Sequence, residues 1–219
     1  MAESVSLTKT IYTALREDIL NGKYTTGDAL TEEEVAKAFG ASRSPVRGAF
    51  RLLEESGLLR LIPNKGALVE GITRKDVADV YEIRLRIEGL ASMEAAKKAT
   101  PENIDQLTEI VDLSDFYLEH GNMDKLKAMD GRFHEYIFDM ADRKILHNVL
   151  SQLLMDVSRF RSASIQSAGR LGQAIEEHRN ILLAIAAHDP QKADLLTRTH
   201  IQNAYNNIQK LLSDSKLED

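Results

Sequence analysis

Four side chains in the C-terminal half of the chain have the types and spacing of a metal site. Asp130 and His134 are four residues apart, so they share one face of a helix. His178 and His200 each lie on the apolar stripe of a later helical pattern. One carboxylate and three imidazoles suit a divalent ion such as zinc, with nickel or manganese as alternatives. Spacing alone leaves a second interpretation open, in which each histidine is an ordinary hydrogen-bonded or partly exposed helix residue.

A second group of side chains could bind nucleic acid. Arg43, Arg47 and Arg51 recur every four residues, so they share the outward face of one helix. A guanidinium can donate two hydrogen bonds to guanine O6 and N7, or bind a phosphate. Lys65 and Gly66 lie at the tip of a turn, where a basic side chain would reach the DNA backbone or a minor groove. The alternative, a solvated helix face, explains the arginines but not the elements around them.

The arginines lie on the second of two short helices joined by a tight turn. Thr31 and Glu34 match a capping box for the first helix, and Gly40 ends it. Ser42 or Ser44 caps the second helix, whose first turn also contains a proline that is tolerated there. The pattern predicts a helix-turn-helix.

Two short strand patterns follow, over 58–62 and 67–70, with a turn between them. A helical pattern over 7–20 precedes the helix-turn-helix and supplies apolar residues at four-residue spacing. Together these elements predict a winged helix-turn-helix DNA-binding domain over residues 1–71.

Beyond residue 72 we find only helical patterns, after a linker at Gly71–Ile72. They run over about 73–99, 100–120, 122–141, 144–165, 172–188 and 190–213, with a break of small residues at 167–172. The fold class is therefore mainly α, with an all-helical bundle of about six helices over residues 72–219.

Composition limits the functional classes. The 219 residues suit two modest domains, and the absence of cysteine excludes disulfides and thiolate zinc sites. No apolar run is long enough to span a bilayer, and no signal peptide is present, so we expect a cytoplasmic protein without a membrane partner. The net charge of −6 is uneven: residues 41–66 carry +3, which leaves −9 for the rest. An acidic chain with one basic stripe can still bind DNA, because local charge governs the contact.

The winged segment resembles the N-terminal domain of the GntR family of bacterial transcription regulators, and its Ser-Arg-Ser-Pro-Val-Arg at 42–47 resembles the FadR-type subfamily. The resemblance implies that the recognition helix contacts DNA through Ser42, Arg43, Ser44 and Arg47. It also implies that Gly66 allows close approach of the wing. Gly48 departs from the pattern, because the subfamily usually has glutamate there. A glycine inside a helix costs about 1 kcal/mol relative to alanine.

The helical segment resembles the FCD-type ligand domain that is paired with this winged helix. The resemblance rests on Asp-x-x-x-His followed by one histidine in each of the last two helices. It implies that Asp130, His134, His178 and His200 bind the metal, and that the ligand is a small organic acid. The segment Tyr-Glu-Ile-Arg-x-x-x-Glu at 81–88 also resembles the start of that domain.

Two residues are candidates for binding the organic acid. Arg84 could hold a carboxylate with its guanidinium fork, or instead form an i,i+4 ion pair with Glu88. Asn203, one turn beyond His200, could donate to the ligand or orient another side chain. Arg159 and Arg161 are weaker candidates by the same logic.

These features predict a ligand-responsive transcription regulator. It would bind a near-palindromic DNA operator as a homodimer, because two recognition helices need two half-sites. A small carboxylate metabolite would either release or strengthen DNA binding. One alternative is the same regulator with a structural metal and a different effector. The other is a metalloenzyme with Glu176 or Glu177 as its base, for which no catalytic motif is present, so we expect no enzyme.

Overall fold

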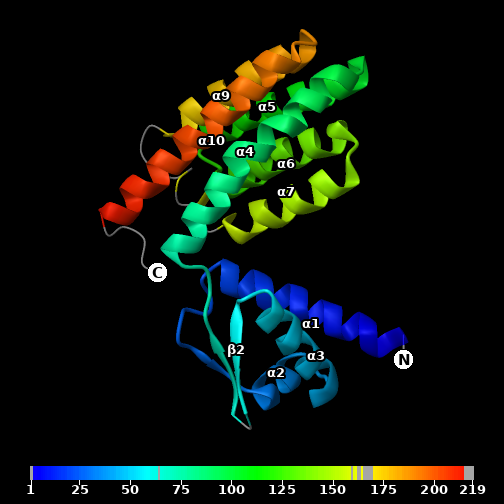
Figure 1. The fold of residues 1–219 in the computed structure, drawn as a ribbon, viewed down its shortest axis with the longest axis vertical. Coiled ribbons are helices and arrows are strands. Elements are labelled where there is room, and N and C mark those ends of the chain that lie inside the picture. Colours follow the sequence, from blue (N-terminus) through cyan, green and yellow to red (C-terminus); the bar gives the residue numbers. More distant parts are fainter. Residues whose placement is uncertain (1, 64, 159, 162–163, 165–169, 215–219) are drawn as a thin grey trace. The chain divides into compact units, whose positions relative to one another are not determined.

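The computed structural model describes residues 2–63, 65–158, 160–161, 164 and 170–214. These residues form two compact units, which are divided between Arg74 and Lys75 (Figure 1). The division lies close to the boundary after residue 71 that the sequence suggested.

The N-terminal unit is a winged helix-turn-helix, as predicted. Its helices are α1 (Ala2–Leu20), α2 (Glu32–Ala38) and α3 (Arg43–Glu55). Its strands are β1 (Ala29–Leu30), β2 (Leu59–Ile62) and β3 (Gly66–Val69), which form an antiparallel sheet in the order β1-β3-β2. The sequence predicted only the last two strands, because a two-residue strand is too short to show alternation. Helix α1 also begins earlier than the apolar pattern at residue 7 indicated.

Local signals explain the helix ends around the turn. The Thr31 hydroxyl accepts a hydrogen bond from the Glu34 backbone N–H at 3.2 Å, which forms the capping box. Gly40 adopts a left-handed φ of 57° between α2 and α3. Ser42 occupies the N-cap position of α3 but its side chain makes no capping hydrogen bond, and Ser44 lies inside the helix. Ser42 therefore lies at the expected N-cap position but does not cap the helix with its side chain.

The close approach of β1 and β3 requires glycine at position 66. Its φ of 101° is rarely adopted by other residues, and an added Cβ would clash with the Leu30 carbonyl oxygen on β1. We expect Gly66→Ala to lower the free energy of unfolding of the N-terminal unit by about 2 kcal/mol. Chemical denaturation would measure the change. Gly131→Ala is the control, because an added Cβ there meets no atom within 4 Å and alanine favours the helix. Equal stability of Gly66→Ala and wild type would contradict this account.

Gly48 lies where α3 packs against α1. An added Cβ at this position would lie 2.9 Å from Thr8 Cγ2, which is closer than side chains normally pack. The glycine therefore permits a close approach of the two helices. The departure from the subfamily pattern at Gly48 therefore lies at a contact between α1 and α3.

The C-terminal unit is a helical bundle (Figure 1). Its six described helices are α4 (Arg74–Lys98), α5 (Pro101–Glu119), α6 (Met123–Ala141), α7 (Lys144–Asp156), α9 (Arg170–Ala186) and α10 (Pro190–Ser213). Thr100 and Asn103 form a capping box at the start of α5, and the Asp189 side chain accepts from the Lys192 N–H at the start of α10. The prediction of an all-helical bundle of about six helices is confirmed.

One predicted helix is interrupted in the structure. The pattern indicated a continuous helix from 144 to about 165, but α7 ends at Asp156 and a turn follows at Val157, after which the described residues 158, 160–161 and 164 are helical again. No glycine or proline marks this end, so the sequence contained no stop signal. The apolar side chains of Val157 and Phe160 are both buried, and packing decides the path here. The predicted break at 167–172 lies largely outside the described residues, and α9 already includes residues 170–172.

Along the part of the chain that the structure describes, no helix combines the length and the apolarity needed to cross a bilayer.

Candidate metal centre and nucleic-acid interface

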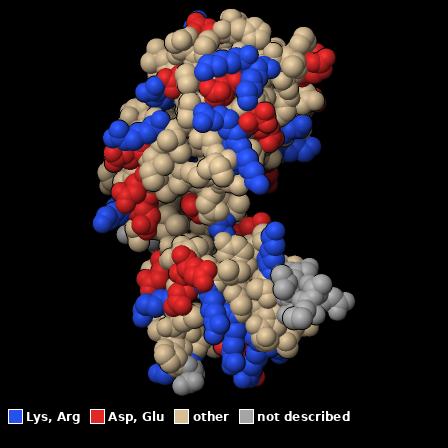
Figure 2. Space-filling model, turned by 45° about the vertical axis from the view of Figure 1, so that its right-hand side comes forward, with Lys and Arg blue, Asp and Glu red and all other residues tan. Residues whose placement is uncertain are grey.

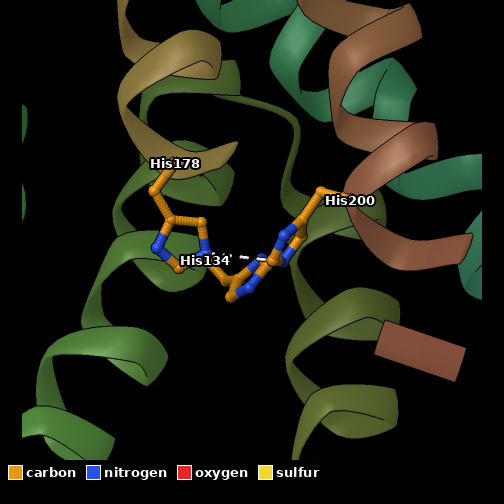
Figure 3. Close-up of side chains that lie close together, drawn as sticks. All are labelled: His134, His178 and His200. Carbon is orange, nitrogen blue, oxygen red and sulfur yellow. Dashed lines mark hydrogen bonds between the residues drawn. The ribbon is translucent and has the colours of Figure 1, made fainter. Parts of the chain in front are cut away.

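Three histidines from three helices converge inside the C-terminal bundle. His134 comes from α6, His178 from α9 and His200 from α10, and their imidazoles turn towards one another (Figure 3). One ring nitrogen from each lies within 4.8 Å of the other two. The Nε2 atoms of His178 and His200 are 3.4 Å apart. We call these three residues the histidine cluster, and all three are buried.

Carboxylates orient two of the three rings from behind. His134 Nδ1 lies 2.7 Å from Glu88 Oε1, and His200 Nδ1 lies 2.6 Å from Glu177 Oε2. An ionised carboxylate only accepts hydrogen bonds, so Nδ1 is the donor in each ring. The lone pair is then on Nε2, which is the tautomer that a metal-binding histidine with an outer carboxylate adopts.

The cluster is electrostatically suited to a cation. Burial lowers the pKa of His134 to about 4, although Glu88 acts in the opposite direction. Burial and the neighbouring imidazole of His200 also hold the pKa of His178 well below its usual value. Both rings are therefore neutral at pH 7, as metal ligands must be. Three converging imidazoles in a buried site fit a divalent ion with nitrogen ligands.

Asp130 lies at the edge of the histidine cluster. One of its carboxylate oxygens is 3.8 Å from His178 Nε2, and the other accepts a hydrogen bond from the Arg161 guanidinium. Burial is the largest single influence and raises the pKa of Asp130, but the positive charge of Arg161 and smaller contributions from neighbouring groups together outweigh it, so the net shift is downward. Asp130 is thus ionised and close to the cluster, and its role as fourth ligand stays a prediction.

If Asp130 is a ligand, the metal and Arg161 compete for it. We expect Arg161→Leu to raise zinc affinity by about tenfold or more, because the substitution frees the carboxylate and removes a nearby positive charge. Competition with a chromophoric zinc chelator would measure the affinity. Arg132→Leu is the matched control, since Arg132 is an exposed arginine on the same helix as Asp130. An affinity unchanged from wild type would show that Asp130 does not bind the metal.

A repeated arrangement surrounds the histidine cluster. Each histidine has a carboxylate beside it, and each carboxylate is paired with an arginine. The three sets are Arg84–Glu88–His134, Arg161–Asp130–His178 and Arg170–Glu177–His200. Arg170 is not among the residues predicted from the sequence, and Glu177 was expected only as a possible catalytic base. Arg170 and Glu177 both lie on α9, but Glu177 reaches His200 only where α9 packs against α10, and no local sequence signal reports that packing.

The two predicted ligand-binding residues both make internal contacts. Arg84 donates from Nε and Nη2 to Glu88 at 2.8 and 3.3 Å, so the ion pair considered as its alternative role is formed. Asn203 Nδ2 donates to Glu177 Oε1 at 2.8 Å and thereby orients the partner of His200. Their contacts with a ligand stay predictions. Arg159 lies outside the described residues, whereas Arg161 lines the same cavity as Arg84.

The remaining histidines lie away from the cluster. His120 and His188 are exposed, as expected from their positions at helix ends. His147 is half-buried, and its Nε2 lies 3.1 Å from Asp139 Oδ1. This contact joins α7 to α6, which agrees with a role in helix packing.

The N-terminal unit has a groove between α3 and the wing. The groove has a volume of about 740 Å³. Of the seven predicted DNA-binding residues it contains Arg43, Arg47, Arg51, Lys65 and Gly66. Ser42 and Ser44 are exposed at the start of α3. Figure 2 shows Lys and Arg side chains gathered on the surface of this unit beside a group of acidic side chains.

Two of the groove arginines are paired with acidic residues of α2. Arg43 Nη2 lies 2.6 Å from Glu33 Oε2, and Arg47 Nε lies 2.7 Å from Glu32 Oε1. Both arginine side chains are more than half exposed, at 59% and 61%. Exposed ion pairs contribute little to stability, so a phosphate or a base edge can replace the carboxylates at low cost. Spacing alone could not reveal this pairing.

Comparison with known proteins identifies the family of both units. The model for bacterial regulatory proteins of the gntR family matches residues 7–69, and the FCD domain model matches residues 79–203, which is more than half of the chain. The HTH-type transcriptional repressor RspR of Escherichia coli is 27% identical over 94% of this chain and 90% of its own length. The gluconate operon transcriptional repressor of Bacillus subtilis is 28% identical over 91% of this chain and 82% of its own length.

Solved structures share the fold. The structure described as E. coli McbR/YncC has a TM-score of 0.78 at 21% identity and covers 95% of this chain and 99% of that chain. A putative GntR regulator from Rhodococcus sp. RHA1 has a TM-score of 0.73 at 23% identity, with 94% and 98% covered. The relatives named here are regulators of transcription rather than enzymes, in agreement with the expectation from the sequence. The chain belongs to the GntR family of bacterial regulatory proteins and is a transcriptional regulator with a C-terminal FCD domain.

Proposed function

We propose that this regulator binds a near-palindromic operator as a homodimer in the cytoplasm, and that it senses a small organic acid at a metal-containing pocket of its C-terminal unit. The observation that carries the proposal is a cavity lined by two members of the histidine cluster and by three arginines. The cavity is lined by Tyr81, Arg84, Asp130, His134, Arg161, Ser164, Arg170, Ala174, His200 and Ala204. Metal ligands and guanidinium groups facing one cavity are the chemistry that recognises a carboxylate.

The residues of this pocket have three roles: they bind the metal, orient the metal ligands or bind the effector. His134, His178 and His200 hold the metal, with Asp130 as the fourth ligand, while Glu88 and Glu177 keep two of the rings in the binding tautomer. Zinc is the first choice of ion, with nickel or manganese as alternatives. The bound ion supplies a Lewis-acidic position for an effector oxygen. Arg84 lines the cavity and adds positive charge beside the effector, whereas Asn203 lies outside the lining and acts by orienting Glu177.

DNA binding uses α3 and the wing. A dimer presents two recognition helices, so the operator has two half-sites about one helical turn apart, or a multiple of this distance. The effector acts by binding more tightly to one arrangement of the dimer than to the other. The name of the Bacillus subtilis relative refers to gluconate, and a sugar acid is one of the small carboxylates that this pocket chemistry suits.

In the first step of the test, zinc-loaded protein selects the DNA duplexes that it binds from a library of random sequence. Fluorescence anisotropy at fixed salt then measures operator affinity with acetate, lactate, citrate or gluconate added. We expect selected sequences with two half-sites, and a change of about fivefold or more in Kd with at least one carboxylate. Selection of a single half-site would contradict the dimer, and the same Kd with every carboxylate would contradict the sensing role.

The small size of the cavity favours a second candidate, in which the metal is structural and the effector binds elsewhere. The cavity volume is about 20 Å³, which is room for about one water molecule. In that case zinc removal lowers the melting temperature, and no carboxylate alters the melting temperature of the zinc-loaded protein. The carboxylate titration therefore separates the two candidates.

A further inference from the structure

Two buried polar atoms in the cavity lining have no hydrogen-bond partner among the described residues. They are Tyr81 Oη and Arg170 Nη1. The Tyr81 side chain is fully buried, and Arg170 is 5% exposed. Buried donors without a partner are rare in native proteins and each one needs an explanation. Both residues lie in the lining beside His134 and His200, so the explanation concerns this cavity.

Neighbouring contacts hold both donors in place. Arg170 Nη2 donates to Glu177 at 2.8 Å, which fixes the plane of the guanidinium. The Tyr81 ring stacks on Tyr205 with ring centroids 5.1 Å apart, and the Arg84 guanidinium lies 4.9 Å from the Tyr81 ring centroid. Neither donor can turn away without breaking these contacts. A ligand would therefore meet two donors that are already oriented.

The charge of the surrounding groups defines the ligand class. Three arginines and three carboxylates balance one another in the sets around the histidine cluster. Burial raises the pKa of Tyr81, so its hydroxyl stays protonated and able to donate. A divalent ion on the imidazoles would add two positive charges, which an anion would offset. The anion must be compact, because the cavity is small.

We propose that Tyr81 Oη and Arg170 Nη1 each donate one hydrogen bond to the effector carboxylate and form its binding subsite beside the histidine cluster. A carboxylate presents two coplanar acceptors for these two donors. Phosphate or sulfate would bring further oxygens into the cavity, for which the described lining has no other unpartnered buried donor. This subsite rests on the proposed function, because it names the part of the sensing pocket that recognises the effector.

The test uses zinc-loaded full-length protein, with acetate as the smallest probe and Tyr81→Phe as the variant. We expect acetate to raise the melting temperature of wild type, and the Kd for acetate to increase about tenfold or more in Tyr81→Phe. Without acetate, the melting temperature of Tyr81→Phe should equal or exceed that of wild type, because the deleted hydroxyl had no partner. Tyr205→Phe is the matched control, since Tyr205 stacks on Tyr81 but does not line the cavity.

Other outcomes would overturn the subsite. A lower melting temperature of Tyr81→Phe with an unchanged acetate Kd would mean that the hydroxyl binds only a structural water. Stabilisation of wild type by phosphate but not by acetate would exclude a carboxylate, and no response to acetate would exclude the subsite itself.

Arg170→Lys provides an independent variant that keeps the charge and removes Nη1. We expect weaker acetate binding at unchanged zinc content. A loss of zinc instead would mean that Arg170 acts only by holding Glu177, and would overturn its part in the subsite. Operator affinity of wild type without acetate is measured in parallel. If wild type does not bind the operator, the proposed function is refuted. The zinc and acetate titrations test the subsite whether or not the protein binds DNA.

Discussion

Replacing Arg43 and Arg47 together with alanine is expected to weaken operator binding by a factor of about 100 or more. Both side chains lie in the groove between α3 and the wing, and both are exposed. Their present partners, Glu33 and Glu32, hold them in exposed ion pairs that contribute little to folding. The substitution should therefore leave the fold stable while removing two contacts to base edges or phosphates.

Fluorescence anisotropy on a selected operator would measure this loss, together with the dependence of Kd on salt. We expect the slope of log K against log salt to fall by as much as about two, one for each phosphate contact that is lost. Arg86→Ala/Arg198→Ala is the matched control, because both are exposed arginines in i,i+4 ion pairs of the C-terminal unit. If both double variants lost affinity equally, general charge rather than the groove would explain binding.

His178→Ala/His200→Ala is expected to abolish metal binding, from about one divalent ion per chain in wild type to none. The two residues supply two of the three converging imidazoles, and the one that remains with Asp130 cannot complete a tetrahedral site. The stability that metal binding adds is lost as well. This amounts to about 4 kcal/mol when free zinc exceeds its Kd a thousandfold.

Elemental analysis of protein purified without affinity-tag nickel would measure the metal content per chain. Thermal unfolding with and without zinc would measure how much zinc stabilises the protein. His120→Ala/His147→Ala is the control, because it removes two histidines that lie outside the histidine cluster. Wild type that holds no metal even after reconstitution with zinc would refute the metal site. The winged helix-turn-helix would be unaffected by that result.

Short-range signals were sufficient to predict most of the fold. The capping box at Thr31, the left-handed position of Gly40 and the spacing of Arg43, Arg47 and Arg51 each depend on residues a few positions apart. Such signals survive in any tertiary context. Two of the mispredicted features, β1 and the end of α7, have no such signal. Strand β1 has only two residues, and α7 ends where the buried side chains of Val157 and Phe160 pack into the core.

The sequence by itself determined which residue types could bind metal and DNA, because an i,i+4 pair on one helix and an arginine every fourth residue are local facts. Only the tertiary structure decided which side chains meet. It brought His134, His178 and His200 together from three helices, placed Glu88 and Glu177 behind two of the rings, and paired Asp130 with Arg161. It also left Tyr81 and Arg170 each with an unpartnered donor in the cavity lining. These relations depend on how distant helices pack, and helix periodicity specifies the face of each helix but not its neighbour.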